Sequence, residues 1–386
     1  MQRRAFVRIL GGGAVLAASG LGTGCSRQLP AEAIAAWQGP DSQAELRRWM
    51  LGYAILAPHS HNLQSWLVDL SQPQQIVLYC DLKRLLPETD PFSRQIVMSQ
   101  GTFLELLSMA ARERGHRAEI TLFPEGEFAP AGPDERPVAR IRLQPDASVA
   151  PDPLFAQVLK RHTNRNAYEA QREVPAAAWQ AMAEAAAPYG LRFGHAGLAQ
   201  PEQLQQQREV AAEAWRIELV TPRTILESYQ VLRVGAREIA EHRDGIALTE
   251  PMVVWLNRLG LFDRSQAPGP DDFATKSQIE DFNAKLQSTP AFMWMVSADN
   301  TRTTQIDAGR AYVRVQLAAT AHGLAMHPLQ QALQEYPEQA GPYRRIRELL
   351  GAQDAPQTVQ MWARVGYAAP VQPAPRRGVQ AHILRT

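Results

Sequence analysis

Ala57-Pro58-His59-Ser60-His61-Asn62-Leu63-Gln64-Ser65-Trp66 is a polar loop at the end of a predicted helix. That helix, Gln43–Leu56, is predicted from its apolar periodicity and from an N-cap at Ser42. A second polar segment, Lys160-Arg161-His162-Thr163-Asn164-Arg165, follows roughly a hundred residues later, a separation far too long for one loop. Each segment alone is common in proteins. Together they indicate one site assembled from two distant parts of the chain.

The chain between and around these segments alternates predicted helices with predicted strands. In the first part, the patterns predict strands at Gln75–Cys80 and Val138–Leu143 and a long helix at Ser93–Arg114 that Gly115 ends. A Pro/Asp-rich connection over residues 144–153 is interpreted as the seam between two halves.

The second part continues in the same style. We predict helices at Pro153–Arg161, Ala176–Ala187 and Ala308–His322, and strands at Leu191–His195, Ala291–Val296 and Val359–Tyr367. Residues 208–243 form a long amphipathic helical stretch that is rich in Glu, Arg and Leu. The predicted class is α+β, with two fused halves that each carry a mixed or antiparallel sheet flanked by helices.

A faint internal repeat supports this division. Gly101 with the helix after it and Gly309 with the helix after it each lead to a further glycine and later to a strand. The alternative, two ordinary helix and strand units matched by chance, stays open. The expected halves are residues 26–150 and 151–386, the second with a helical insertion near 208–285.

The N-terminus predicts export. Arg3-Arg4 precedes an apolar, glycine-rich run from Ile9 to Leu21, which is typical of a twin-arginine signal over residues 1–25 and of a periplasmic protein. The run is shorter than the roughly 20 apolar residues of a membrane span. Cys25 lies where the cysteine of a lipoprotein would lie, so a lipid anchor is left open. Beyond export or lipidation, no membrane association is expected.

Charge and cysteine content narrow the function classes. The formal net charge is +1, which argues against a nucleic-acid surface. After Cys25 only Cys80 remains, so removal of the signal would leave no intramolecular disulfide, and Cys80 is expected to be a buried thiol. With 45% hydrophobic residues the chain can form one large core or two moderate ones.

The basic segment resembles a segment of the nitroreductase superfamily. Residues 160–168 are similar to the Arg-x-Ser-x-Arg/Lys pattern that holds FMN there, with Thr163 in place of serine. The resemblance implies that Arg161 and Thr163 bind the phosphate and ribityl chain, and that Arg165 lies near the N1–O2 edge of the ring. Guanidinium groups suit phosphate because their donors form a fixed fork.

The loop at residues 57–66 resembles the Pro-Ser-x-x-Asn-x-Gln-Pro-Trp loop of the same superfamily, which reaches the flavin from the opposite subunit of a dimer. Ser60, Asn62 and Gln64 match it, while Ser65 replaces the second proline and one residue is missing before Asn62. The loop here precedes the basic segment, whereas in the family it follows. This order implies a pseudo-dimeric monomer with one composite site and one degenerate site.

Two further segments extend the resemblance. Residues 322–331 are similar to a Gly-x-x-x-x-Pro turn, which implies main-chain contacts of Gln330 and Gln331 to the flavin, and Arg377 matches a terminal phosphate-binding arginine. The closest pattern is the Acg-like branch of fused single chains. It implies an FMN-dependent oxidoreductase that passes electrons from an undetermined donor to a small acceptor, such as a nitro compound or quinone. The alternative is a non-catalytic flavin-sequestering or storage protein whose insertion covers FMN as a lid.

Other chemistries have little support in the sequence. His59 and His61 form a His-x-His pair but lack an obvious third ligand nearby, so no metal site is expected. No Walker loop, Gly-x-Ser-x-Gly elbow or Gly-x-Gly-x-x-Gly fingerprint occurs, which argues against NTPase, hydrolase and Rossmann functions. No catalytic side chain is predicted, because in such a cycle the flavin supplies the chemistry.

Overall fold

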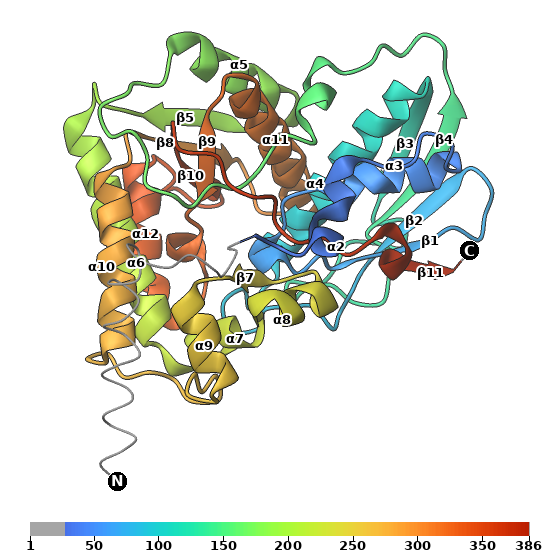
Figure 1. Cartoon of the computed structure of the whole chain (residues 1–386). Helices are drawn as coiled ribbons and strands as arrows, with labels where there is room; N and C mark the ends of the chain where they lie inside the picture. Colours follow the sequence, from blue (N-terminus) through green and yellow to red (C-terminus); the bar gives the residue numbers. More distant parts are fainter. Residues whose placement is uncertain (1–27, 386) are drawn as a thin grey trace.

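The computed structural model describes residues 28–385, in which two separate sheets stand side by side with helices around and between them (Figure 1). The twin-arginine segment and Cys25 lie outside the described residues. Within residues 28–385, no helix combines the length and the hydropathy needed to span a bilayer.

The first sheet comes from the N-terminal part of the chain and from its extreme C-terminus. Its order is β11-β1-β2-β4-β3. The strands are β1 (Trp66–Asp69), β2 (Gln75–Cys80), β3 (His116–Leu122), β4 (Ala139–Pro145) and β11 (Ile383–Arg385). Burial alternates along β2, as expected for a sheet with one face on the core. β11 pairs in parallel with β1, so the tail of the expected second half lies in the first sheet.

The second sheet comes from the C-terminal part and is all antiparallel. Its order is β5-β8-β10-β9, with β5 (Arg192–Ala196), β8 (Ala291–Ser297), β9 (Ala325–Pro328) and β10 (Thr358–Gly366). Every residue of the two central strands β8 and β10 is buried, which explains their largely apolar character. The α+β class predicted from the sequence is confirmed.

Two long helices, α4 (Arg94–Glu113) and α11 (Arg302–Ala321), pack against each other between the sheets. A Cβ on Gly101 of α4 would stand 2.0 Å from the carbonyl oxygen of Ile306, and a Cβ on Gly309 of α11 would stand 1.8 Å from that of Met98. The absence of a side chain at each glycine therefore lets the backbone of the other helix approach closely. The two contacts are reciprocal, as in an interface between symmetric subunits, which supports the internal repeat.

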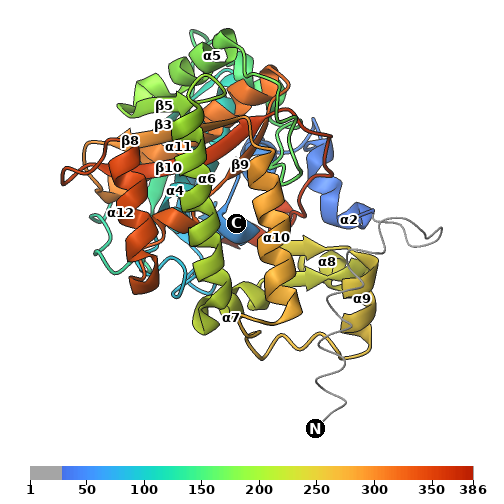
Figure 2. The ribbon, with the colours of Figure 1, turned by 90° about the vertical axis from the view of Figure 1, so that its left-hand side faces the viewer.

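A helical insertion separates β5 from β8. It contains α6 (Pro201–Val220), α7 (Pro222–Gln230), α8 (Gly235–His242), α9 (Pro251–Arg258) and α10 (Phe273–Gln287), with a small parallel sheet of β6 (Leu232–Val234) and β7 (Ile246–Leu248). Figure 2 shows α6 and α10 standing against the second sheet, and α8 and α9 at the lower edge of the molecule.

Shorter elements connect the layers. They are α2 (Ala31–Ile34), α3 (Leu46–Ala54), α5 (Ala176–Ala186), α12 (Ala340–Leu349) and the 3₁₀ turns η1 (Ala35–Gln38), η2 (Ser60–Asn62), η3 (Pro153–Gln157), η4 (Ala187–Tyr189), η5 (Gln331–Leu333), η6 (Pro337–Gln339) and η7 (Val379–His382).

One predicted helix is wrong, and the helical stretch predicted at residues 208–243 is divided into α6, α7 and α8, with β6 between the last two. Pro153–Arg161 forms the 3₁₀ turn η3 and then a hydrogen-bonded turn at residues 158–160 instead of a continuous helix. The Asn164 N–H donates to the Met326 carbonyl at 3.0 Å, and Thr163 forms a parallel β-bridge with Met326. The chain thus passes from these turns into pairing with β9 two residues after Arg161.

Candidate functional site

The loop at residues 57–66 has a strained backbone. His61, Asn62 and Gln64 all have positive φ, at 48°, 55° and 55°, in the left-handed region that residues other than glycine seldom adopt. Such conformations persist only where surrounding contacts fix them, and they gather at functional sites. The loop is therefore a candidate binding element on structural grounds as well.

His59 braces this loop from inside. Its Nδ1 lies 2.8 Å from the Ser60 carbonyl, while its Nε2 lies 2.7 Å from the Ser65 hydroxyl and accepts from the Ser65 N–H at 3.1 Å. Burial lowers the pKa of His59 to about 3, so the ring is neutral. Among residues 28–385 no group of three or more His, Cys, Asp or Glu side chains is placed to hold a metal.

Arg161 of the basic segment lies buried beneath the loop. It donates to the Leu56 carbonyl and to Gln316 Oε1, both at 2.9 Å. Leu56 follows α3, so the guanidinium faces carbonyls at the negative end of that helix. The segment and the loop, far apart in sequence, thus meet at the end of α3.

Arg376 of the C-terminal tail is the second cation at this place. It donates to the Ala57 carbonyl at 3.1 Å, to the Leu56 carbonyl at 3.4 Å and to Asn62 Oδ1. The guanidinium carbons of Arg376 and Arg161 lie 5.3 Å and 5.5 Å from the ring centre of Trp37. Sequence matching did not identify Arg376 or Trp37. The one feature of the sequence that could have indicated Arg376 is its position directly before Arg377, the arginine that the resemblance predicted.

These two cations lack a compensating negative charge. Among residues 28–385, neither Arg161 nor Arg376 forms an ion pair with a carboxylate, and the Nε of each is buried without a hydrogen-bond partner. Burial lowers the pKa of Arg161 to about 10, and burial together with Arg161 lowers that of Arg376 to about 9. Buried charges normally have a partner, so the arrangement fits a bound anion.

Arg377, the arginine predicted from the sequence, lies beside a different residue. Its backbone N–H donates to Gln64 Oε1 at 2.9 Å and its guanidinium to the Gln64 carbonyl at 2.5 Å. Gln64 itself is fully buried. Arg377 therefore holds the loop, whereas Arg376 shares the location of Arg161.

Arg165 lies at the accessible end of the site. Solvent reaches its side chain, which donates no hydrogen bond within residues 28–385, although the surrounding protein atoms lower its pKa by burial. Burial, with a smaller contribution from Arg165, lowers the pKa of His61 to about 4. The His61 side chain is nevertheless half-exposed, so solvent reaches this end of the site even though protein atoms surround the ring closely enough to lower its pKa. Burial, then Arg364 and Arg165, lower the pKa of His327 of β9, and within the described residues the buried hydroxyl of Tyr312 has no hydrogen-bond partner.

The remaining predicted residues lie around this group. Ser60 receives no contact from the basic segment, and its hydroxyl lies 3.3 Å from His61 Nδ1. Gln330 donates to the Gln360 carbonyl at 3.3 Å, which leaves its buried side-chain oxygen unpaired. Gln331 begins η5, and its side chain bonds to Glu218 of the insertion. The structure thus brings Asn62, Arg161 and Gln64 together with the tail, whereas Gln330 and Gln331 contact neither arginine.

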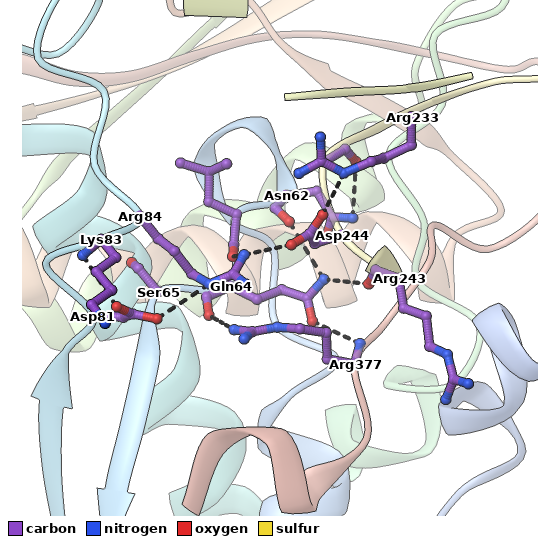
Figure 3. A network of polar contacts seen from close by, with 12 residues as sticks. Asn62, Gln64, Ser65, Asp81, Lys83, Arg84, Arg233, Arg243, Asp244 and Arg377 are labelled. Atoms are coloured by element: carbon purple, nitrogen blue, oxygen red, sulfur yellow. Dashed lines mark hydrogen bonds and ion pairs between the residues drawn. The ribbon is translucent and has the colours of Figure 1, made fainter. Parts of the chain in front are cut away.

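The insertion closes on the loop through Arg243, Asp244 and Gly245 (Figure 3). Asn62 and Gly245 exchange two hydrogen bonds of 3.1 Å, and Gln64 donates to the Arg243 carbonyl at 2.9 Å. The buried Asp244 carboxylate bridges Arg233 of the insertion and Arg84 of the first sheet's loops. The insertion is therefore fixed to the loop by hydrogen bonds and to the neighbouring Arg84 by charge.

No family model matches this chain. Two proteins of Mycobacterium tuberculosis, from strains CDC 1551 and H37Rv and both named "putative NAD(P)H nitroreductase", are similar to it. Each is 29% identical over 349 residues, which span 86% of this chain and 90% of the relative. The similarity therefore extends over most of the length of both chains.

Solved structures give lower similarity. An FMN-dependent nitroreductase from Clostridium difficile R20291 is 14% identical and covers 56% of this chain and 87% of its own, with a TM-score of 0.31. The FMN-dependent nitroreductase of Mycobacterium smegmatis, solved in complex with NADPH, is 20% identical and covers 56% and 92%, with a TM-score of 0.34.

Proposed function

We propose, from the premise that this chain belongs to the nitroreductase superfamily, that it binds one FMN between its two sheets. It would act as an oxidoreductase that passes electrons from reduced FMN to a small acceptor such as a nitro compound or quinone. The mycobacterial relatives carry NAD(P)H nitroreductase in their names, which favours this chemistry and a nicotinamide donor.

The pair of buried, uncompensated arginines carries the proposal. Arg161 and Arg376 have no carboxylate partner among the described residues, and each keeps a buried Nε donor unused. A phosphate monoester supplies up to two negative charges and three acceptor oxygens, which matches two forked guanidinium groups. The residues present therefore fit the phosphate end of FMN.

The other residues would position the remainder of the cofactor. Asn62 is oriented by Arg376 and Gly245, and Arg165 places free donors at the accessible end, where they would offset negative charge on the reacting ring. Bound FMN would supply the electron and hydride transfer itself. The chain's part would be to bind and orient the cofactor and to exclude water, with no side-chain acid or base in the reaction.

The double substitution Arg161→Ala/Arg376→Ala tests the phosphate site. A hydrogen bond to a charged group contributes about 1.5–3 kcal/mol, so each substitution should weaken FMN binding about 10- to 100-fold. We expect the double variant to purify colourless with an unchanged far-ultraviolet circular dichroism spectrum. The measurement is the ratio of flavin to protein absorbance, with FMN titration of the apoprotein.

Arg377→Ala is the matched control, because the Nε of Arg377 is also buried without a partner among the described residues, while its guanidinium and backbone N–H are bonded to Gln64 rather than to the Leu56 and Ala57 carbonyls. It should reduce FMN affinity less than Arg376→Ala does. A full flavin complement in the double variant, or loss of flavin only in the Arg377→Ala variant, would show that the anion is not bound between Arg161 and Arg376.

A second function, sequestration of FMN without turnover, is favoured by one observation. The insertion is bonded to Asn62 and Gln64 through three hydrogen bonds and is held by the Asp244 bridge. If this closure also covers the flavin face, a nicotinamide or acceptor could not stack on the ring.

Anaerobic reduction separates the two functions. Dithionite should bleach the bound flavin in either case, because it does not need to stack on the ring. Bleaching by NADPH, followed by reoxidation with a quinone, supports the oxidoreductase. A flavin that dithionite reduces but neither NADPH nor NADH reduces supports sequestration.

A further inference from the structure

The tip of the insertion exposes an apolar surface that nothing in the described chain covers. Trp255 is 55% exposed, Leu259 53% and Leu261 43%. Six large hydrophobic residues are exposed in residues 28–385, and these three fall within seven positions of each other. Single exposed leucines are normal on a protein surface, whereas a contiguous group marks an interaction site. We call Trp255, Leu259 and Leu261 the tip patch.

The patch lies at the C-terminal end of a helix with two apolar faces: Trp255 is on α9, and Leu259 and Leu261 follow its last residue, Arg258. α9 contains no buried residue, although its sequence is Pro-Met-Val-Val-Trp-Leu-Asn-Arg. Val253 and Val254 are partly buried against the small core of the insertion, where they hold the helix in place. Trp255 and Leu259, one turn apart, project from the other side. The patch is therefore presented at the end of a supported helix.

The patch itself carries little charge, although Glu250 and Asp263 lie just outside it. Between Glu250 and Asp263, the only charged residue is Arg258, which is exposed beside Leu259. Tryptophan with neighbouring leucine and a basic residue is the composition of helices that lie in the interface of a bilayer. A long basic side chain can remain at the headgroups while the apolar residues enter.

The start of the described chain lies close to the same corner. α2 contacts α8, which belongs to the same small unit as α9, and Figure 2 shows α2, α8 and α9 along one side of the molecule. Gln28 follows Cys25 by three positions, a span of about 10 Å at full extension. The predicted export segment with its lipoprotein-like cysteine would therefore place this corner next to a membrane.

We propose that the tip patch docks on a phospholipid bilayer containing anionic lipid, with Trp255, Leu259 and Leu261 in the interface and Arg258 at the headgroups. The docking orients the chain with α9 toward the membrane. This inference is independent of the flavin, since no residue of the patch belongs to the FMN site.

A fluorescent label on the patch tests the proposal in the full chain. Cys25→Ser removes the only other thiol apart from Cys80, which is 5% exposed and so resists labelling. Leu259→Cys carries an environment-sensitive nitrobenzoxadiazole group, and Leu384→Cys is the matched control, at 52% exposure on β11 of the first sheet. Vesicles of phosphatidylethanolamine and phosphatidylglycerol are then added, with and without brominated acyl chains.

We expect a blue shift and quenching by brominated lipid at position 259, several-fold larger than at position 384. Adding Trp255→Ser and Leu261→Ser should remove the response at 259. Equal responses at both positions, or an unchanged response after these substitutions, would overturn the proposal. A blue shift at 259 that needs no vesicles and grows with protein concentration would also overturn it, in favour of a second copy of the chain as the partner.

Discussion

At the scale of single residues, buried charge without a counter-charge is the most informative property of this chain. Other buried arginines are satisfied within the fold: Arg94 pairs with Glu335, and Arg364, which has no carboxylate partner, donates from all three of its nitrogens. Arg161 and Arg376 instead combine burial and the lack of a carboxylate with an unused donor. This combination points to an external anion.

Glu218, a buried acid, makes stability depend on pH. Burial first, and Glu227 in addition, raise its pKa from 4.5 to about 7. Between these pH values the folded chain keeps a proton that the unfolded chain releases, so stability should fall as pH rises from 4.5 to 7, by about 1–3 kcal/mol. Glu218→Gln should remove the part of the fall that belongs to Glu218, whereas the buried Asp90, whose pKa burial raises to about 6, keeps its own part. Urea unfolding at pH 4.5 and pH 8 measures the fall, with Glu209→Gln on the exposed side of α6 as control. An equal fall in the Glu218→Gln variant would contradict the assignment.

At the scale of elements, the crossing of α4 and α11 joins the two sheets. Gly309→Ala places a Cβ where the Met98 carbonyl lies, so the helices must separate, at a cost of about 1–3 kcal/mol or more. Gly341→Ala is the matched control, because this helical glycine has no atom within 4 Å of a new Cβ. It should be neutral or slightly stabilising. Thermal unfolding compares the two, and equal stability would mean that the crossing tolerates a wider separation.

At the scale of the whole molecule, the site is composite. The loop at residues 57–66 precedes most of β1, and the basic segment at residues 160–165 follows β4. The C-terminal tail then returns to this place and contributes Arg376, before it ends in β11. Each of these segments occurs once. We therefore expect one FMN per monomer, measured by native mass spectrometry of the flavin-loaded protein. Two FMN per chain would reveal a functional second site, and one per two chains would show that two copies complete the site.

The sequence by itself determined the elements whose patterns are local. β2 at Gln75–Cys80 matches its prediction residue for residue, and α4 and β10 differ from theirs by about one position at each end, because apolar periodicity depends only on neighbours in the chain. It also identified the two segments that meet at Leu56. Arg161 was predicted as a site residue from its segment, and its unpaired buried charge is consistent with that role.

Only the tertiary structure decided what distant residues do together. Arg376 reaches the Ala57 carbonyl across 319 positions, and Asn62 pairs with Gly245 across 183. No local pattern encodes such contacts. The same reason explains β11, which forms a strand because the edge of β1 offers it unpaired backbone groups. Local sequence sets the elements, whereas the burial of charge and the pairing of backbone across the fold set the site.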